Sequence, residues 1–267
     1  MDTIRIDDPE DPRVAPDLDI RERDVVGRQG RFIAEGKVVL NVLLNGSRFQ
    51  AESVLVLENR LAGLEEVFDK APVRVPVYVA GREVIDRIAG FPIHRGILAV
   101  GEKGTPLQVD DILRTLPQKA LIVVAVGIAN HDNLGAIFRN AAAFGADAVF
   151  IDPTCCDPLY RKAIRVSVGA ALKVPFAAAP DPASLSTDLM ACGFKSFALS
   201  PSGVTDIRDV QPGEKTALYL GTEGEGLPAP LLARMQTLRI NMAKGFDSVN
   251  VAAASAIALH HFSASDR

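Results

Sequence analysis

Residues 120–135 read ALIVVAVGIANHDNLG, and this stretch decides the fold class of the chain. Its first ten residues are apolar without alternation, which is typical of a strand buried on both faces of a parallel sheet. A helix that spans a bilayer needs about 20 such residues, so the run is too short to be one. We therefore predict a strand over residues 121–126, then a polar loop, then a helix over residues 133–144.

The alternation of strand and helix continues downstream of this stretch. Further strands are predicted over residues 148–151, 195–199 and 217–220, a helical stretch over 160–168, and a closing helix over 249–262. Strands that alternate with helices in this way form mainly parallel sheets. We therefore assign residues 119–267 to one α/β domain with a mainly parallel sheet.

A smaller α/β domain is predicted upstream, over residues 25–101. Its predicted elements are an amphipathic helix over residues 32–44, strands over 54–57, 76–79 and 96–100, and a short helix over 83–88. Residues 102–118 contain glycine and prolines and form the predicted linker, with a short helix over 109–116. Residues 1–24 are polar, carry three prolines, and are predicted to form an extended or mobile arm.

Charge and cysteine content exclude several classes of protein. The 267 residues carry 29 basic and 33 acidic side chains, so a globally basic nucleic-acid-binding protein is excluded, whereas a local basic patch is not. Residues 1–12 hold five acids and one arginine, which places the net charge of −4 in the N-terminal segment. Cys155, Cys156 and Cys192 form neither a disulfide framework nor a zinc pattern. Without a signal peptide or a membrane span, we expect a soluble cytoplasmic protein with reduced thiols.

Three polar loops of the second domain fall where ligands bind in open parallel sheets, beyond the carboxyl ends of strands. The first contains Asn133, a candidate helix cap, and Arg139, which is either an ion-pair partner or a phosphate ligand. The second, GTEGEGLP at residues 221–228, is neither a dinucleotide fingerprint nor a Walker loop. The third is INMAKGFDSVNV at residues 240–251, in which Asp247 or Ser248 is the expected cap of the last helix.

Together the three loops resemble the signatures of the SpoU-type RNA ribose 2′-O-methyltransferases of the SPOUT superfamily. NLGAIFRNA at residues 133–141 with FGA at 144–146 resembles the first signature, and GTEGEGL at 221–227 the second. INM at residues 240–242, followed after five residues by SVN, resembles the third. Residues 28–100, with Glu35, Gly36 and the segment 93–99, are similar to the family's substrate-binding domain, which resembles small RNA-binding ribosomal proteins.

The resemblance implies an S-adenosylmethionine-dependent methyltransferase with a C-terminal trefoil knot, acting as a homodimer on structured RNA, with rRNA favoured over tRNA. No metal is required by this chemistry. Family positions match Gly221, Ile240, Met242 and Val249 for cofactor binding. They match Arg139, Asn133, Glu223, Ser248 and Asn250 for catalysis, with Arg139 acting as a base or only orienting the substrate. A non-catalytic RNA-binding protein on the same fold is the alternative.

Two groups of basic residues are candidate RNA contacts, with ordinary solvated charges as the alternative interpretation. The first group lies at the start of the smaller domain and the second between the first two signatures. Their members are Arg21, Arg23, Arg28, Arg31 and Lys37, and then Arg161, Lys162 and Arg165.

Overall fold

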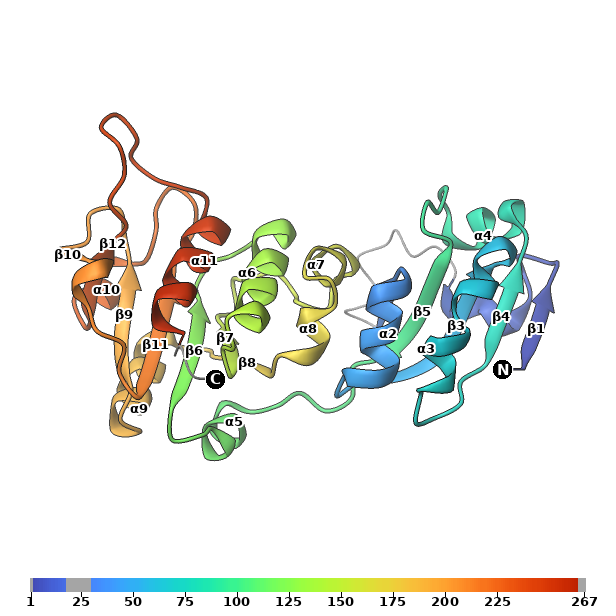
Figure 1. Cartoon of the computed structure of the whole chain (residues 1–267), viewed down its shortest axis with the longest axis horizontal. Helices are drawn as coiled ribbons and strands as arrows, with labels where there is room; N and C mark the ends of the chain where they lie inside the picture. Colours follow the sequence, from blue (N-terminus) through green and yellow to red (C-terminus); the bar gives the residue numbers. More distant parts are fainter. Residues whose placement is uncertain (1, 18–29, 264–267) are drawn as a thin grey trace. The chain divides into compact units, whose positions relative to one another are not determined.

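The structure is a computed structural model that describes residues 2–17 and 30–263 (Figure 1). Arg21, Arg23 and Arg28, predicted as RNA contacts, lie outside the described residues. The chain divides into two compact units. Unit 1 comprises Met1–Thr105 and Pro158–Lys173, and unit 2 comprises Pro106–Asp157 and Val174–Arg267.

Unit 1 is built on a mixed five-stranded sheet with the strand order β1-β4-β3-β5-β2. The strands are β1 Thr3–Ile6, β2 Arg31–Glu35, β3 Gln50–Leu57, β4 Val77–Ala80 and β5 Ile97–Glu102. Strands β1, β4 and β3 run parallel, whereas β5 is antiparallel to both β3 and β2. The helical elements are η1 Pro12–Asp17, α2 Lys37–Gly46, η2 Glu58–Gly63, α3 Glu65–Asp69, α4 Arg82–Ala89, α7 Arg161–Val166 and α8 Ala170–Lys173.

Two predictions for unit 1 are wrong. Residues 32–44 are not one helix, because β2 ends at Glu35 and α2 begins at Lys37. Gly36 lies between them with φ 96°, a left-handed backbone that interrupts a helix and suits glycine. Of the two alternatives for the arm of residues 1–24, extended or mobile, the mobile one is wrong for residues 3–6 and 12–17, which belong to unit 1. Strand β1 pairs with β4, and the side chains of Ile6 and Val14 are fully buried in the core of unit 1.

Within unit 1, the segment 158–173 is joined to strand β2 by ion pairs to a buried carboxylate. Glu35 at the end of β2 is 5% exposed, and its Oε2 lies 2.9 Å from Arg161 Nη1 and 3.7 Å from Arg165 Nη1. The Arg161 guanidinium also lies over the ring of Phe91, 4.6 Å from its centroid. A buried charge is tolerated where it is paired. Arg161 and Arg165, predicted as candidate RNA contacts, are therefore ion-pair partners inside this unit.

Unit 2 contains a seven-stranded sheet in which every pairing is parallel, as the apolar runs predicted. The strand order is β10-β12-β9-β11-β6-β7-β8. The strands are β6 Ala120–Ala125, β7 Ala148–Ile151, β8 Phe176–Ala178, β9 Lys195–Leu199, β10 Thr205–Asp206, β11 Lys215–Leu220 and β12 Gln236–Arg239. The helical elements are α5 Val109–Thr115, α6 His131–Ala143, α9 Pro182–Ala191, η3 Ile207–Asp209, α10 Ala229–Leu232 and α11 Val251–Phe262.

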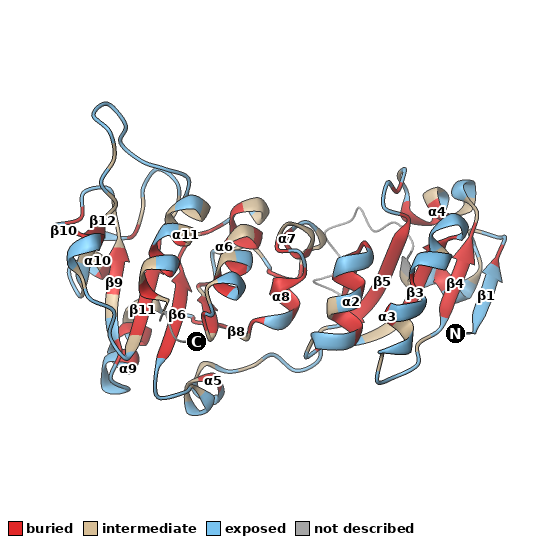
Figure 2. Ribbon diagram, viewed as in Figure 1, coloured by how far each residue is buried: buried red, intermediate tan, exposed pale blue. Residues whose placement is uncertain are grey.

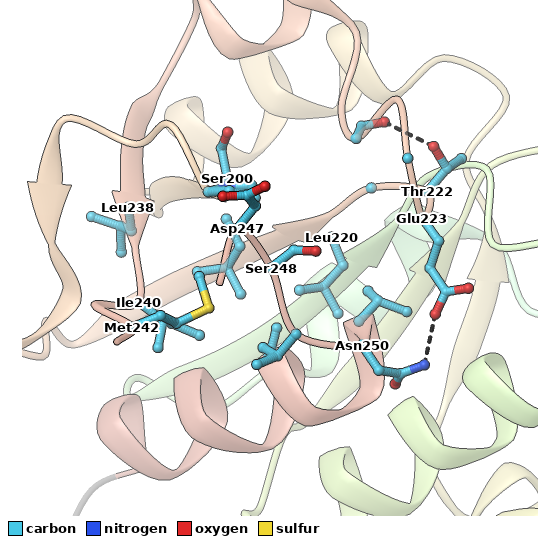
Figure 3. A pocket seen from close by; sticks show the side chains of 18 residues that line it. Ser200, Leu220, Thr222, Glu223, Leu238, Ile240, Met242, Asp247, Ser248 and Asn250 are labelled. Carbon is cyan, nitrogen blue, oxygen red and sulfur yellow. Dashed lines mark hydrogen bonds between the residues drawn. The ribbon is translucent and has the colours of Figure 1, made fainter. Parts of the chain in front are cut away.

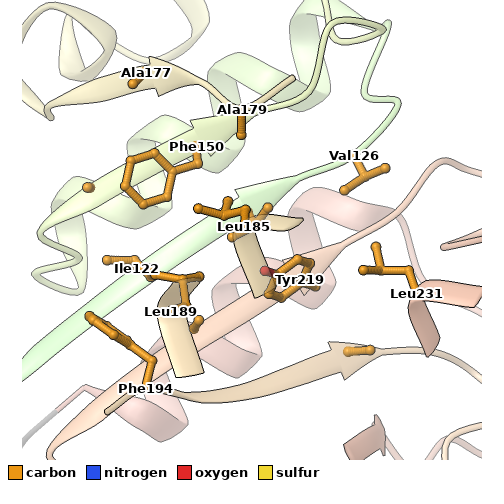
Figure 4. Close-up of a cluster of buried hydrophobic side chains, with 14 of the residues drawn as sticks. Ile122, Val126, Phe150, Ala177, Ala179, Leu185, Leu189, Phe194, Tyr219 and Leu231 are labelled. Atoms are coloured by element: carbon orange, nitrogen blue, oxygen red, sulfur yellow. The ribbon is translucent and has the colours of Figure 1, made fainter. Parts of the chain in front are cut away.

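The core of unit 2 lies against the central strands of this sheet (Figures 2 and 4). All six residues of β6 are buried, and Tyr219 of β11 and Phe150 of β7 are fully enclosed. Leu185 and Leu189 of α9 pack into the same cluster. Burial of this kind stabilises a domain by about 25 cal/mol per Å² of apolar surface removed from water.

The α/β class with a large parallel sheet is confirmed, while the trefoil knot stays a prediction. Strands β8, β10 and β12 were not predicted, because each is short and has at most one fully buried residue. None of the helices within residues 2–17 and 30–263 is long and apolar enough to cross a membrane.

Candidate functional site

A cavity of about 590 Å³ lies at the carboxyl edge of the unit 2 sheet (Figure 3). Strands β9, β11 and β12 all end at it, and the segment 240–250 and the start of α11 complete its wall. The four positions matched to cofactor binding, Gly221, Ile240, Met242 and Val249, all line this cavity. Parallel strands bring their carboxyl ends to one edge, so residues distant in sequence meet there.

The loop after β11 is held in a tight conformation by its glycines. A Cβ atom at Gly221 would lie 2.4 Å from the carbonyl carbon of Gly226 and 2.4 Å from the amide nitrogen of Leu227. The Thr222 amide donates to the Gly226 carbonyl at 3.3 Å, which closes the loop, and Gly226 itself has φ 72°. Backbone therefore passes backbone at a distance that no side chain permits at position 221.

Asn250 joins the three signatures through its side-chain amide. Its Nδ2 donates to Asn133 Oδ1 at 2.9 Å and to Glu223 Oε1 at 2.6 Å. Its Oδ1 accepts from the Ala252 amide at 2.8 Å, so Asn250 is also the N-cap of α11. The Nδ2 donors of one amide group thus link the three signatures, while its oxygen caps α11.

The structure contradicts two predicted helix N-caps, those of α6 and α11. The N-cap of α6 is Asn130, whose side chain accepts from the amides of Asp132 and Asn133. Asn133 lies one turn into α6, is 8% exposed, and uses its side chain on Asn250 instead. At α11 the cap is Asn250, which leaves Ser248 free to line the cavity.

Arg139 is placed apart from the other matched residues. It lies on the exposed side of α6 and is absent from the cavity wall of its own chain. Within residues 2–17 and 30–263 it has no hydrogen-bond or ion-pair partner. The ion pair weighed from the sequence is therefore absent from this part of the chain, and the guanidinium faces outward.

A buried carboxylate supports the loop between β6 and α6. Asp152 Oδ1 accepts from the Gly127 amide at 2.8 Å, and Oδ2 accepts from the Thr154 hydroxyl at 2.7 Å. Burial alone would raise the pKa of Asp152, but these hydrogen bonds outweigh it and the pKa is lowered. Gly127 in turn packs on Thr222, since a Cβ there would lie 2.4 Å from Thr222 Cγ2. The carboxylate thus holds the backbone beneath the glycine loop.

Cys155 and Cys156 help to hold the same loop in place and are not reactive thiols. Cys155 Sγ accepts from the Ile128 amide at 3.2 Å and donates to the Ala125 carbonyl at 3.3 Å. Burial raises the pKa of Cys155 to about 12 and that of Cys156 to about 11. Thiols with such pKa values are protonated at neutral pH and are poor nucleophiles.

Sequence reasoning missed several residues of the cavity. Ser200 and Pro201 follow β9, and Thr222 and Asp247 stand beside matched positions. Figure 3 shows Leu238, Ile240 and Met242 at one end of the cavity, and Glu223 with Asn250 at the other. The signal that could have found Ser200 is its position, directly after a buried parallel strand.

The chain matches known proteins along most of its length. The model of the SpoU rRNA Methylase family matches residues 120–260. A protein from Mycobacterium tuberculosis named an uncharacterized tRNA/rRNA methyltransferase is 37% identical over 270 residues, covering 97% of this chain and 91% of that protein. One of the same name from Synechocystis is 28% identical over 244 residues, covering 87% and 84%.

Solved structures share the fold over nearly the whole chain. An RNA 2′-O ribose methyltransferase has a TM-score of 0.79 at 26% identity, covering 97% of this chain and 98% of that one. The SpoU methyltransferase AviRb of Streptomyces viridochromogenes, solved in complex with AdoMet, has a TM-score of 0.77 at 21% identity, covering 94% and 95%. The resemblance predicted from the three signatures is confirmed. Because the family model covers more than half of the chain and the mycobacterial relative is 37% identical along nearly all of it, this chain belongs to the SpoU rRNA methylase family and is an RNA methyltransferase.

Proposed function

We propose that the protein transfers a methyl group from S-adenosylmethionine to a ribose 2′-hydroxyl in structured RNA, with rRNA favoured over tRNA. The observation that carries this proposal is the hydrogen-bonded link from Asn133 through Asn250 to Glu223 at the cavity. It unites one polar residue from each signature. We also place the protein in the cytoplasm, where such RNA is found.

The cavity has the size and chemistry that S-adenosylmethionine requires. Its volume of about 590 Å³ falls within the range of small-ligand sites, about 300–1,000 Å³. Leu238, Ile240 and Met242 offer apolar cover for an adenine ring, and the carboxylates of Glu223 and Asp247 suit positively charged groups. When bound, the cofactor supplies an electrophilic methyl group on a sulfonium.

The chain's own residues then bind and orient the RNA. A ribose hydroxyl has a pKa far above neutrality, so it requires a proton acceptor or a strongly orienting environment. The Arg139 guanidinium offers a fork of donors to a phosphate. We assign it the placement of the target nucleotide. Ser248 and Asn250, at the cavity, are the neighbouring groups that hydrogen-bond the substrate.

We propose a homodimer in which Arg139 serves the cavity of the partner subunit. Arg139 is exposed and lies off the cavity wall of its own chain, as described above. On the neighbouring helix α11, Ile257 is 43% exposed, and Val249 just before that helix is 42% exposed. Exposed apolar side chains beside a functional residue favour contact with a second copy over contact with water.

Methyl transfer from radiolabelled S-adenosylmethionine to total RNA tests this function. Wild type is expected to label RNA, and Arg139→Ala to lose most of that activity. If neither protein labels RNA but both still bind it, the non-catalytic alternative is favoured. Equal labelling by both would remove Arg139 from the site.

Mixed dimers test the exchange of Arg139 between subunits. Arg139→Ala and Asn250→Ala are each expected to lose most of their activity alone, but a mixed dimer has one cavity with both residues intact. Random mixing should restore about a quarter of the wild-type activity, since half of the dimers are mixed and each has one complete site. No restoration after verified subunit exchange would place Arg139 in its own chain's site.

A further inference from the structure

The loop between β12 and α11, residues 240–250, carries a large aromatic side chain that does not line the cavity. Phe246 is 74% exposed and is absent from the cavity wall, although Met242 before it and Asp247 directly after it line that wall. We propose that Phe246 stacks on the base of the nucleotide that is methylated, with Lys244 at its phosphate. The inference rests on the proposed function in one respect, that a nucleotide of RNA is held at this cavity.

A tight turn in this loop presents Lys244 and Phe246 together. The Phe246 amide donates to the Ala243 carbonyl at 3.2 Å, and Gly245 at the third position of the turn has φ 88°. A positive φ at that position favours glycine. Figure 1 shows the loop standing away from the rest of unit 2 between the end of β12 and the start of α11. The turn therefore holds a cation and an aromatic ring in solvent.

Neither of these two side chains contributes to the packing of the fold. Among residues 2–17 and 30–263, Lys244 and Phe246 have no hydrogen-bond, ion-pair or ring partner. Every other phenylalanine of the chain is buried or half-buried. A single exposed apolar residue is ordinary on a protein surface, but this one stands beside both a ligand cavity and an unpaired cation. That combination indicates a binding role.

The position of Phe246 in the chain brings it within reach of a nucleotide at the cavity. The acceptor ribose has to lie there, because its hydroxyl must meet the methyl group of the cofactor. Figure 3 shows Asp247 and Ser248 among the side chains that line the cavity. Consecutive Cα atoms are about 3.8 Å apart, so the ring of Phe246 starts one residue from this wall. A base attached to the bound ribose can therefore meet it.

The chemistry of the turn suits a nucleotide of RNA better than the cofactor. Unpaired RNA bases are recognised by stacking on aromatic side chains, and lysines bind backbone phosphates. The adenine of S-adenosylmethionine already has apolar cover from Leu238, Ile240 and Met242 inside the cavity. Phe246 lies outside that lining, so its ring is available to the second substrate.

The variant Phe246→Trp provides a direct optical probe, because the chain contains no tryptophan. Its emission is followed while deproteinised bacterial rRNA, or bacterial tRNA, is added to the full-length protein without cofactor. Stacking on a base should quench the emission with at least one of the two RNAs. Met190→Trp is the matched control, since Met190 is 65% exposed on α9, outside the cavity, and that helix leads into the amino end of β9. Its emission should not change.

Methylation kinetics provide the second arm. Loss of one stacked base weakens binding roughly 5- to 150-fold, and Phe246→Ala should raise the KM for RNA by such a factor. Phe246→Tyr keeps the ring and should retain the wild-type KM, and calorimetry should show unchanged affinity for S-adenosylmethionine in both variants. Lys244→Gln should reduce the slope of log K against log salt by about 0.7, the value for one phosphate contact on a single strand.

An unchanged KM in Phe246→Ala would overturn the inference, as would absence of quenching by an RNA that the wild type binds, or absence of binding to both RNAs. Quenching by S-adenosylmethionine alone would assign Phe246 to the cofactor, and quenching that rises with protein concentration without RNA would assign it to a subunit contact. Either result refutes base stacking. Because quenching and salt slopes are measured without methyl transfer, an inactive wild type that shows both as expected would refute only the proposed function.

Discussion

Replacing Asn250 by Ser separates the two tasks that this residue performs. Serine caps helices as well as asparagine does, so the bond to the Ala252 amide is retained, whereas the shorter side chain does not reach Asn133 or Glu223. Asn250→Ala removes all three bonds. The comparison therefore isolates the link between the signatures from the stability of α11.

The expected magnitudes follow from the hydrogen bonds that each variant removes. Loss of the cap costs about 1 kcal/mol, and leaving the buried amide of Asn133 unpaired costs about 1–3 kcal/mol. Asn250→Ala should thus lower the free energy of unfolding by about 2–4 kcal/mol. Asn250→Ser keeps the cap, so it should lower the free energy of unfolding by only about 1–3 kcal/mol. The hydrogen bond to the Glu223 carboxylate is charge-assisted, so its loss should weaken cofactor binding and turnover by about tenfold in both variants.

Urea unfolding, calorimetry with S-adenosylmethionine and single-turnover methylation of RNA measure these three effects. Asn250→Asp is the matched control, since it keeps the cap but places a second carboxylate beside Glu223. It should lose more activity than Asn250→Ser. Wild-type cofactor affinity and turnover in Asn250→Ser would refute the claim that the link organises the site.

Three further outcomes are expected from unit 2. Gly221→Ala should abolish cofactor binding in calorimetry, because its Cβ would lie 2.4 Å from the Gly226 backbone; normal binding would contradict this. The lowered pKa of Asp152 means that its stabilising contribution is present above the ordinary carboxylate pKa and is lost as the pH falls through the lowered value. Thermal denaturation between about pH 7 and pH 3 should therefore show a smaller acid-induced loss of thermal stability for Asp152→Asn than for wild type. Equal losses in the two proteins would contradict the stabilising role of the Asp152 carboxylate. At about pH 8, a thiol reagent should modify exposed Cys192 well before Cys155, whose pKa of about 12 keeps it protonated, and mass spectrometry of the modified peptides checks the order.

Fully buried strands were the part of the fold most accessible from the sequence. Strand β7, AVFI, has the predicted bounds, because a strand covered on both faces is a continuous apolar run. Strand β9, KSFAL, also has the predicted bounds, although only Phe197 and Ala198 in it are buried. Strand β2 was mistaken for part of a helix, since apolar residues in 32–44 fit both periods and only the left-handed turn at Gly36 separates them. Strand β12, QTLR, has Leu238 as its one fully buried residue and carries no pattern.

The sequence predicted which residues belong to the candidate site better than it predicted how those residues contact one another. The signatures contain Asn133, Glu223 and Asn250, but capping rules alone could not assign the first and last correctly. The bond between Asn133 and Asn250 joins residues 117 positions apart, and it exists because α6 and α11 pack together. A tertiary contact of this kind overrides the local preference of an asparagine for a helix cap. The ion pairs of Arg161 and Arg165 were not foreseen for the same reason, because their partner Glu35 is remote in sequence.

The central claim is that the methyl group is transferred to a ribose 2′-hydroxyl of RNA. Incubating rRNA with the protein and isotopically labelled S-adenosylmethionine, digesting it to nucleosides and separating them by mass spectrometry tests this directly. We predict that the label is found in one 2′-O-methylnucleoside, with the added mass on the ribose fragment, and that Arg139→Ala does not produce it. Label on the base fragment, or no labelled nucleoside from rRNA or tRNA, would contradict the account.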